Sequence, residues 1–255
     1  MMKKLYDKSK LYFALASIAA YCVLMSASDA LSEKLGVAKS VTAVVGIVLC
    51  IVLFTFLKKN SLLATYGLCL PQLSAGRMLY YAPLLLLLSA NLWRGICLNC
   101  STLECTLYII SMLCVGFLEE LIFRGLLFCA MQKDSPRAAV IVSSVTFGIG
   151  HIVNLVNGSG AELVPNLLQV IYATSAGFMF VEIFVKTKSL LVCIATHALF
   201  NSLSVFANES DQTLEWRIIS CVLLTLISGT YALYIATKVK TEENDCRFGC
   251  DMPSA

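Results

Sequence analysis

Long apolar segments separated by short polar connectors make up most of this chain. The connectors are rich in Lys, Asn, Ser, Gly and Pro, whereas each apolar segment is near the roughly 20 residues that a helix needs to cross a bilayer. Eight such segments can be delimited, at about residues 11–31, 41–57, 78–96, 106–131, 138–156, 165–185, 189–206 and 216–237. The pattern predicts an all-α polytopic membrane protein with about eight transmembrane helices, forming one integral membrane domain over residues 1–255.

Composition supports a membrane protein and argues against a soluble domain and against a nucleic-acid-binding protein. Of the 255 residues, 58% are hydrophobic and 14% are charged, which is more apolar surface than a soluble domain can bury. The net charge of +3 is too small to indicate a nucleic-acid partner, so lipid is the expected surrounding partner. Half of the 12 cysteines lie inside these apolar segments, where a thiol behaves as a small hydrophobe.

The distribution of Lys and Arg predicts the orientation in the membrane. If the N-terminus is cytosolic and eight spans follow, fourteen Lys and Arg residues fall on the cytosolic side. Only four then lie outside, namely Lys34, Lys39, Arg94 and Arg217, and Arg124 lies within the membrane. Cytosolic loops carry such an excess of cations. We therefore expect both termini in the cytosol and the chain in the cell membrane, and its compact loops are typical of a bacterial protein.

Ionisable groups within the apolar segments are few, and such groups usually mark function because they are costly to bury. Apart from Asp29 and Glu182, which lie near the ends of their segments, they fall in three spaced patterns: Glu119 and Glu120 with Arg124, Phe147 with His151, and His197 with Asn201. A spacing of four places two side chains on one helical face, so Glu120 and Arg124 can form an ion pair. Glu119 is rotated by about 100° from Glu120 and is expected to face a cavity.

Helical rise gives an approximate depth for the three groups. At about 1.5 Å per residue, Glu119 and His151 each lie roughly 21 Å from a cytosolic helix end, and His197 lies roughly 13 Å deep. We therefore expect all three to meet in one cavity that faces the cytosol.

Two kinds of hydrolytic chemistry fit this set. A carboxylate and an imidazole can activate water as general bases, while a second imidazole and an amide stabilise an oxyanion. Alternatively, Glu119, His151 and His197 could hold a zinc ion that activates the water. No HExxH pattern is present, which excludes the common zincin arrangement. The residues leave open whether zinc or no cofactor is used.

The sequences EELIFR, FGIGH and HALFN resemble the EExxxR, FxxxH and HxxxN motifs of the CPBP family, the CAAX prenyl endopeptidases and bacteriocin-processing proteins also called the Abi family. The motif order matches, and the resemblance covers roughly residues 105–205, the expected catalytic core. It implies a CAAX prenyl endopeptidase-like helical bundle and an intramembrane endopeptidase activity.

The resemblance also implies individual roles. Glu119 and His151 would activate the attacking water, and His197 and Asn201 would form the oxyanion site. Glu120 and Arg124 would orient Glu119 and hold the cavity. The family is often labelled a metalloprotease family, although its eukaryotic CAAX members resemble glutamate-dependent enzymes without metal.

The expected substrate is a peptide or protein tail cleaved near the cytosolic membrane face, with bacteriocin processing as one setting. Two other functions remain open. A non-catalytic bacteriocin self-immunity or binding protein could use the same fold, and a proton-coupled transporter could use Glu and His as relays. The absence of a detectable internal repeat argues against the transporter. The sequence does not indicate the oligomeric state.

Overall fold

A computed structural model describes residues 2–98, 100–155, 157, 161–208 and 213–240. Within these ranges the chain is helical apart from its connectors and one isolated bridge between Ile96 and Ala207. The elements are α1 (Met2–Lys8), α2 (Lys10–Lys34), α3 (Ser40–Lys59), η1 (Ala75–Tyr81), α4 (Ala82–Leu88), η2 (Ser89–Leu92), α5 (Thr102–Glu119), η3 (Glu120–Phe128), α6 (Cys129–Gln132), α7 (Pro136–Gly150), η4 (His151–Leu155), α8 (Leu163–Thr187), α9 (Leu191–Leu203), η5 (Ser204–Phe206) and α10 (Leu214–Lys238).

The protein is an all-α polytopic membrane protein, as its hydrophobic pattern predicted. Among the described residues, six helices are long and apolar enough to cross a membrane: Lys10–Lys34, Ser40–Lys59, Thr102–Gln132, Pro136–Leu155, Leu163–Thr187 and Leu214–Lys238. The other two expected spans are shorter. The third is divided into η1, α4 and η2, and the seventh is a single short helix continued by η5. The count of eight spans therefore stays a prediction.

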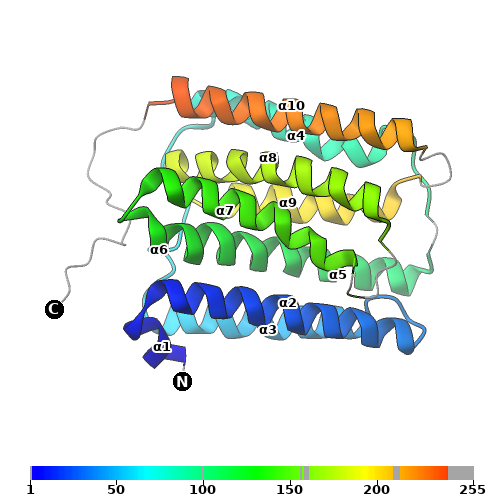
Figure 1. The fold of residues 1–255 in the computed structure, drawn as a ribbon, viewed down its shortest axis with the longest axis horizontal. Helices are drawn as coiled ribbons and strands as arrows, with labels where there is room; N and C mark the ends of the chain where they lie inside the picture. The colour runs from blue at the N-terminus through cyan, green and yellow to red at the C-terminus, as the bar shows by residue number, and fades with distance from the viewer. Residues whose placement is uncertain (1, 99, 156, 158–160, 209–212, 241–255) are drawn as a thin grey trace.

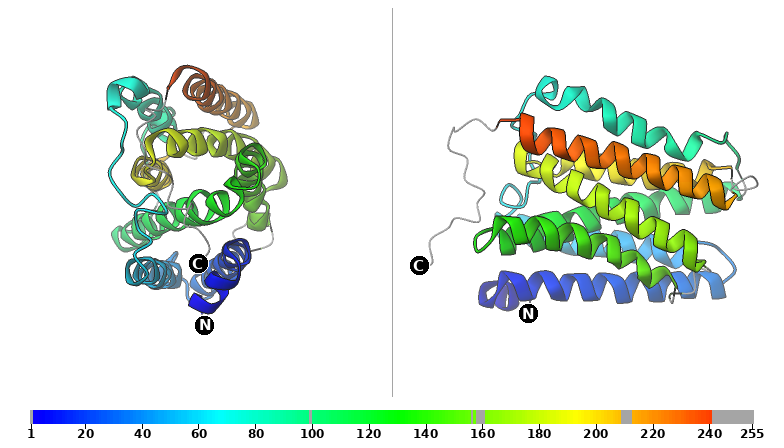
Figure 2. Two further views of the ribbon diagram at one scale, coloured as in Figure 1. Left: turned by 90° about the vertical axis from the view of Figure 1, so that its left-hand side faces the viewer. Right: turned by 45° about the horizontal axis from the view of Figure 1, so that its top comes forward.

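The helices lie side by side with their axes roughly along one direction (Figure 1). Helices α2 and α3 form one edge, and α10 with α4 forms the other (Figure 2). Between them, α5 packs against both α3 and α9, while α8 packs against both α7 and α10. Helix α1 and the last turn of α10 lie at the same end of the bundle (Figure 1), which we call the terminal end. The α2–α3 connector lies at the opposite end.

Local signals in the sequence start several of these helices. Ser101 and Glu104 form a reciprocal capping box at the start of α5. Ser135 caps α7, and Pro136 occupies its first turn, where a missing N–H costs nothing. Thr213 caps α10 in the same way. These caps set where the helices that carry functional side chains begin.

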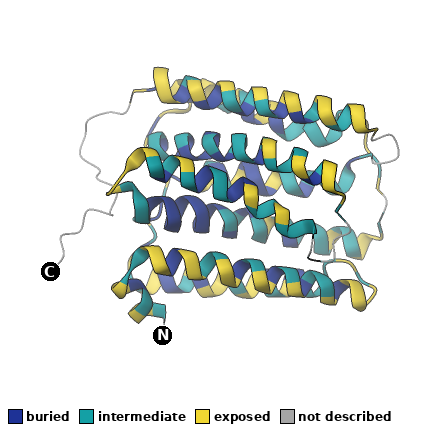
Figure 3. Ribbon diagram, in the orientation of Figure 1, coloured by how far each residue is buried: buried dark blue, intermediate teal, exposed yellow. Residues whose placement is uncertain are grey.

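The segment that follows the paired acids is the most buried part of the chain. Helix α5 continues into η3, a π-helical stretch in which all nine residues from Glu120 to Phe128 are buried. Figure 3 shows this as a continuous dark stretch on the terminal side of the bundle. Wide π-helical turns are often found at functional sites. Its apolar side chains, such as Leu121 and Leu127, close the bundle between the paired acids and the terminal end.

A glycine allows α5 and α9 to approach closely beside the candidate site. A Cβ atom added to Gly116 would lie 2.6 Å from the backbone nitrogen of Ala198, well inside van der Waals contact. Gly116 is three residues before Glu119, and Ala198 follows His197 directly. The absence of a side chain at residue 116 therefore helps to bring His197 towards the paired acids.

Candidate active site

A cavity of about 370 Å³ is lined by at least one residue from each of the three motifs. It lies between α2, α5, α7 and α9, and its walls include Glu119, His151 and Asn201. His197 borders a smaller adjoining space of about 60 Å³, whose walls also include His151 and Asn201. The structure thus brings the three motifs together, although they come from three helices.

Part of the lining of this cavity lies towards the end of the bundle opposite the terminal end. Asp29, Lys39 and Asn157, which lie near connectors at the end opposite the terminal end, line the cavity. On the other side, the buried η3 segment closes it off. If the termini are cytosolic, these lining residues lie towards the opposite membrane side, and the cytosol-facing cavity stays a prediction. The depth of a residue along its helix could not reveal the end at which the cavity lies. That depends on which end of the bundle is filled by packed side chains.

Glu119 is the last residue of α5, and its carboxylate lies in the cavity wall with a side-chain exposure of 14%. The hydroxyl of Tyr21, on α2, donates a hydrogen bond of 2.5 Å to its Oε1 atom. Sequence analysis did not identify Tyr21. It lies in an apolar segment 98 positions away and belongs to none of the motifs, so the only available signal was that a buried tyrosine usually needs a hydrogen-bond partner.

Glu120 and Arg124 form the ion pair that their spacing predicts. Arg124 Nη1 lies 3.1 Å from Glu120 Oε1, and both side chains are fully buried. The guanidinium carbon also lies 3.9 Å from the ring centre of Phe147, in cation–π geometry. Phe147 therefore does more than fill space. It covers a buried charge whose other contacts are the Glu120 carboxylate and the ring of Phe180, 5.5 Å away.

His197 lies between the two acids. Its Nδ1 is 2.8 Å from Glu120 Oε1, and its Nε2 is 3.7 Å from Glu119 Oε2. Its ring also stacks on Phe180 at 6.0 Å. The pair of Glu120 and Arg124 thus fixes His197 directly. The resemblance had implied that this pair orients Glu119, but the observed hydrogen bond of Glu120 runs to the imidazole.

His151 terminates α7 and begins η4. Its ring meets Phe147 edge to face at 5.7 Å, and its backbone carbonyl accepts a 2.8 Å hydrogen bond from the Nδ2 of Asn166 on α8. The His151 ring shares the cavity with Glu119, but no direct hydrogen bond joins these two described side chains. A water molecule between them would be needed for a joint role.

Asn201 lies one turn after His197 on α9 and lines both spaces. Its side-chain amide provides the donor that an oxyanion site requires. The α9 helix thereby presents an imidazole and an amide on the same side, as the four-residue spacing predicted.

The donor set that zinc would need is not assembled. Among the residues that the structure describes, no three His, Cys, Asp or Glu side chains lie close enough together to hold a metal ion. His197 Nδ1 already contacts Glu120, which leaves only Nε2 for a ligand. The set of Glu119, His151 and His197 therefore does not fit a zinc site in this arrangement.

Comparison with known proteins concerns the segment that carries these motifs. Residues 101–203 match the family described as "Type II CAAX prenyl endopeptidase Rce1-like". A protein of Bacillus subtilis (strain 168) named "Putative membrane peptidase YdiL" is 32% identical over 98 residues, which is 38% of this chain and 35% of that protein. The alignment thus spans about a third of the relative's length. Tyr21 lies outside the segment that matches the family.

Proposed function

Residues 101–203 belong to the Rce1-like family of type II CAAX prenyl endopeptidases, and on this premise we propose that the protein is an intramembrane endopeptidase that hydrolyses a peptide bond in a peptide or protein tail. The observation that carries this proposal is the single cavity that receives Glu119, His151 and Asn201, with His197 held at its edge. A general base and an oxyanion site within one polar cavity are what amide hydrolysis requires.

The proposed reaction begins with a water molecule next to Glu119. Glu119 Oε1 is occupied by Tyr21, so Oε2 is the atom available to accept a proton. His151 shares the cavity and would hold the same water. As Glu119 takes the proton, the hydroxide attacks the carbonyl carbon of the scissile bond. The water thus forms the new C–O bond without a metal ion.

The tetrahedral intermediate carries a negative oxygen. With a proton on each ring nitrogen, His197 donates from Nδ1 to Glu120 and from Nε2 to this oxygen, and the Asn201 amide gives the second donor. When the C–N bond breaks, the proton held by Glu119 passes to the leaving amine. The buried ion pair of Glu120 and Arg124 contributes by keeping the imidazole in place.

The reaction is proposed to take place on the membrane side opposite the termini. This differs from the expected cytosolic face, and it is supported by the cavity-lining residues near the connectors at that end and by the closed η3 segment. Maturation of a secreted peptide, such as a bacteriocin, or trimming of a membrane-protein tail would suit such a site.

Glu119→Gln tests the proposal. The variant keeps the shape of the side chain and removes the base, so we expect loss of cleavage without loss of folding. The purified protein in lipid nanodiscs would be incubated with a library of quenched fluorescent peptides, and mass spectrometry would identify the products. Full cleavage by the variant would reject the mechanism. If the wild type cleaved none of the peptides, a non-catalytic immunity or binding role would be favoured instead.

A further inference from the structure

Lysine side chains gather at the terminal end of the bundle, away from the candidate active site. They come from α1, from the first residue of α2 and from the last turn of α3. The set, which we call the basic surface, consists of Lys3, Lys4, Lys8, Lys10, Lys58 and Lys59. Lys10 is half-buried and the others are exposed. Residues 2–10 and 58–60 contain a single acid, Asp7, which pairs with Lys3 at 3.2 Å, so positive charge predominates there.

Helix α1 is held against the bundle by one tyrosine. Its 7 residues are too few for a helix that is stable by itself in water. The ring of Tyr6 meets the rings of Phe13 and Phe56 edge to face, at 5.5 and 5.7 Å, and its hydroxyl accepts a 3.0 Å hydrogen bond from Tyr66. Phe56 lies on α3 two residues before Lys58. The aromatic contacts therefore fix the lysines of α1 beside those of α3.

The two faces of α1 differ in chemistry. Its apolar residues, Met2, Leu5 and Tyr6, pack against the hydrophobic core, whereas its four charged residues are exposed. Ser9 then adopts an extended conformation and caps α2, so that α1 does not continue the axis of α2 (Figure 1). A helix with a charged face and an apolar face, placed at the end of membrane-spanning helices, lies at the level of the lipid headgroups.

Exposed apolar side chains follow the lysines along the spanning helices. Leu11 and Leu15 come directly after Lys10 on α2, with exposed fractions of 38% and 47%, and Phe54, 41% exposed, precedes Lys58 on α3. The basic surface is therefore continuous with apolar walls of the kind that acyl chains cover. A lipid supplies a phosphate and acyl chains together, whereas a soluble phosphate ester supplies only the phosphate.

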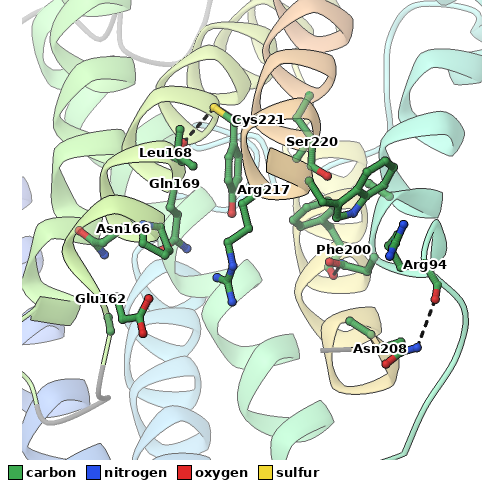
Figure 4. Close-up of a pocket in the computed structure, with 18 residues that line it drawn as sticks. Arg94, Glu162, Asn166, Leu168, Gln169, Phe200, Asn208, Arg217, Ser220 and Cys221 are labelled. Carbon is green, nitrogen blue, oxygen red and sulfur yellow. Dashed lines mark hydrogen bonds between the residues drawn. The ribbon is translucent and has the colours of Figure 1, made fainter. Parts of the chain in front are cut away.

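Cations at the opposite end of the bundle are arranged differently. Arg94 and Arg217 line a cavity of about 490 Å³ beside α10, and Glu162 lies in the wall of the same cavity (Figure 4). The guanidinium carbon of Arg94 also lies 5.1 Å from the ring centre of Trp216. These two cations thus share their surroundings with an acid and an aromatic ring, and the excess of exposed positive charge is a property of the terminal end.

We propose that the basic surface binds the phosphate groups of anionic lipids in the leaflet at the terminal end of the bundle. A zwitterionic lipid carries its own cation beside the phosphate, so the lysines are expected to favour lipids with a net negative charge. The attraction is electrostatic and therefore weakens as salt shortens the distance over which charges act. This inference does not depend on the proposed peptidase function.

Native mass spectrometry of the purified full-length protein tests the proposal. The protein, released from detergent micelles, would be titrated with phosphatidylglycerol and separately with phosphatidylcholine of the same acyl chains. We expect the first phosphatidylglycerol to bind about three- to tenfold more tightly than the first phosphatidylcholine, and the preference to shrink as ammonium acetate is raised. Equal affinity for the two lipids would overturn the proposal. Displacement of the lipid by glycerol 3-phosphate would show that the surface takes a free phosphate ester and would reject the assignment to a lipid.

Paired variants assign the preference to the basic surface. Lys4→Gln with Lys8→Gln should reduce it by about half or more. Arg137→Gln with Lys238→Gln removes the same charge from exposed positions at the same end of the bundle and should leave it unchanged. Asp7→Asn should strengthen it, because the one acid is lost. An equal loss in the two double variants would attribute the preference to total charge and overturn the surface, as would full preference in the Lys4 and Lys8 variant.

Tyr6→Ala tests the placement of the lysines separately from their charge. The variant keeps every lysine but releases α1 from Phe13 and Phe56, so we expect the preference to fall. Tyr12→Ala is the control, because Tyr12 is 62% exposed. Circular dichroism would show that both variants keep the helical bundle. Full preference in a folded Tyr6→Ala protein would contradict a surface built by the docking of α1.

Discussion

The hydroxyl of Tyr21 donates a 2.5 Å hydrogen bond to Oε1 of Glu119 and so joins α2 to the end of α5 across 98 positions of sequence. Such a short bond is typical of a hydroxyl that donates to a carboxylate. It fixes the carboxylate so that Oε2 lies towards His197 Nε2, at 3.7 Å. A residue outside the recognised motifs therefore positions the candidate base.

Tyr21→Phe removes this hydrogen bond and keeps the ring. The lost bond to a charged group corresponds to about 1.5–3 kcal/mol, so we expect kcat to fall by about tenfold or more while KM changes little. Steady-state kinetics on a peptide that the wild type cleaves would measure both constants. Tyr12→Phe is the matched control, because Tyr12 is 62% exposed on the same helix. An unchanged kcat in Tyr21→Phe would show that Glu119 does not depend on this bond.

Glu120→Ala should destabilise the fold much more than Glu119→Gln. Removing Glu120 leaves the fully buried Arg124 without its carboxylate, and breaking a buried pair in this way costs about 3–5 kcal/mol. Glu119 is partly exposed to a cavity, so its replacement by Gln is expected to cost little. Unfolding of the purified proteins in detergent, followed by circular dichroism, would compare them. The double variant Glu120→Gln with Arg124→Met should recover part of the loss, and equal stability of Glu120→Ala and wild type would contradict the argument.

Gly116→Ala should reduce both activity and stability. The added methyl group would lie 2.6 Å from the Ala198 nitrogen, so α9 must move away and take His197 with it. We expect a loss of about 1–3 kcal/mol in the free energy of unfolding, as for other overpacked contacts. Gly229→Ala on α10 is the control, since its new Cβ would only touch Ser175 at 3.4 Å. The same melting temperature for the two variants would argue against a tight α5–α9 contact.

Chelation should leave cleavage unchanged. His197 Nδ1 contacts Glu120, and the described His, Cys, Asp and Glu residues include no group of three that could bind a metal ion. Activity after treatment with 1,10-phenanthroline and exchange into metal-free buffer would be compared with untreated protein. Loss of activity that added zinc restores would show that the catalytic arrangement differs from the one described.

Membrane sidedness gives a further prediction. A green fluorescent protein fused to the C-terminus is expected to fluoresce, because the Lys and Arg distribution places that end in the cytosol. An impermeant peptide substrate should then be cleaved by spheroplasts and not by sealed inverted vesicles, because the cavity lies towards the end opposite the termini. Cleavage only in inverted vesicles would reverse this assignment, and the Glu119→Gln protein in both preparations controls for other peptidases.

The sequence by itself determined the membrane class and the three motifs. Apolar segments of bilayer length cannot be accommodated in water, and ionisable residues within them are so few that their spacing on a helix is informative. The i, i+4 rule was sufficient to predict the ion pair of Glu120 and Arg124, because both partners lie on one helix.

Only the tertiary structure decided how these elements meet. The bond from Tyr21 to Glu119, the contact of Glu120 with His197 and the bond from Asn166 to the His151 carbonyl all join different helical elements, and no periodicity within one helix encodes such a pairing. The end of the bundle towards which the cavity lies was also decided there. It depends on which side of the bundle is filled by packed side chains. The η3 segment fills the terminal side, since all nine of its residues are buried against neighbouring helices.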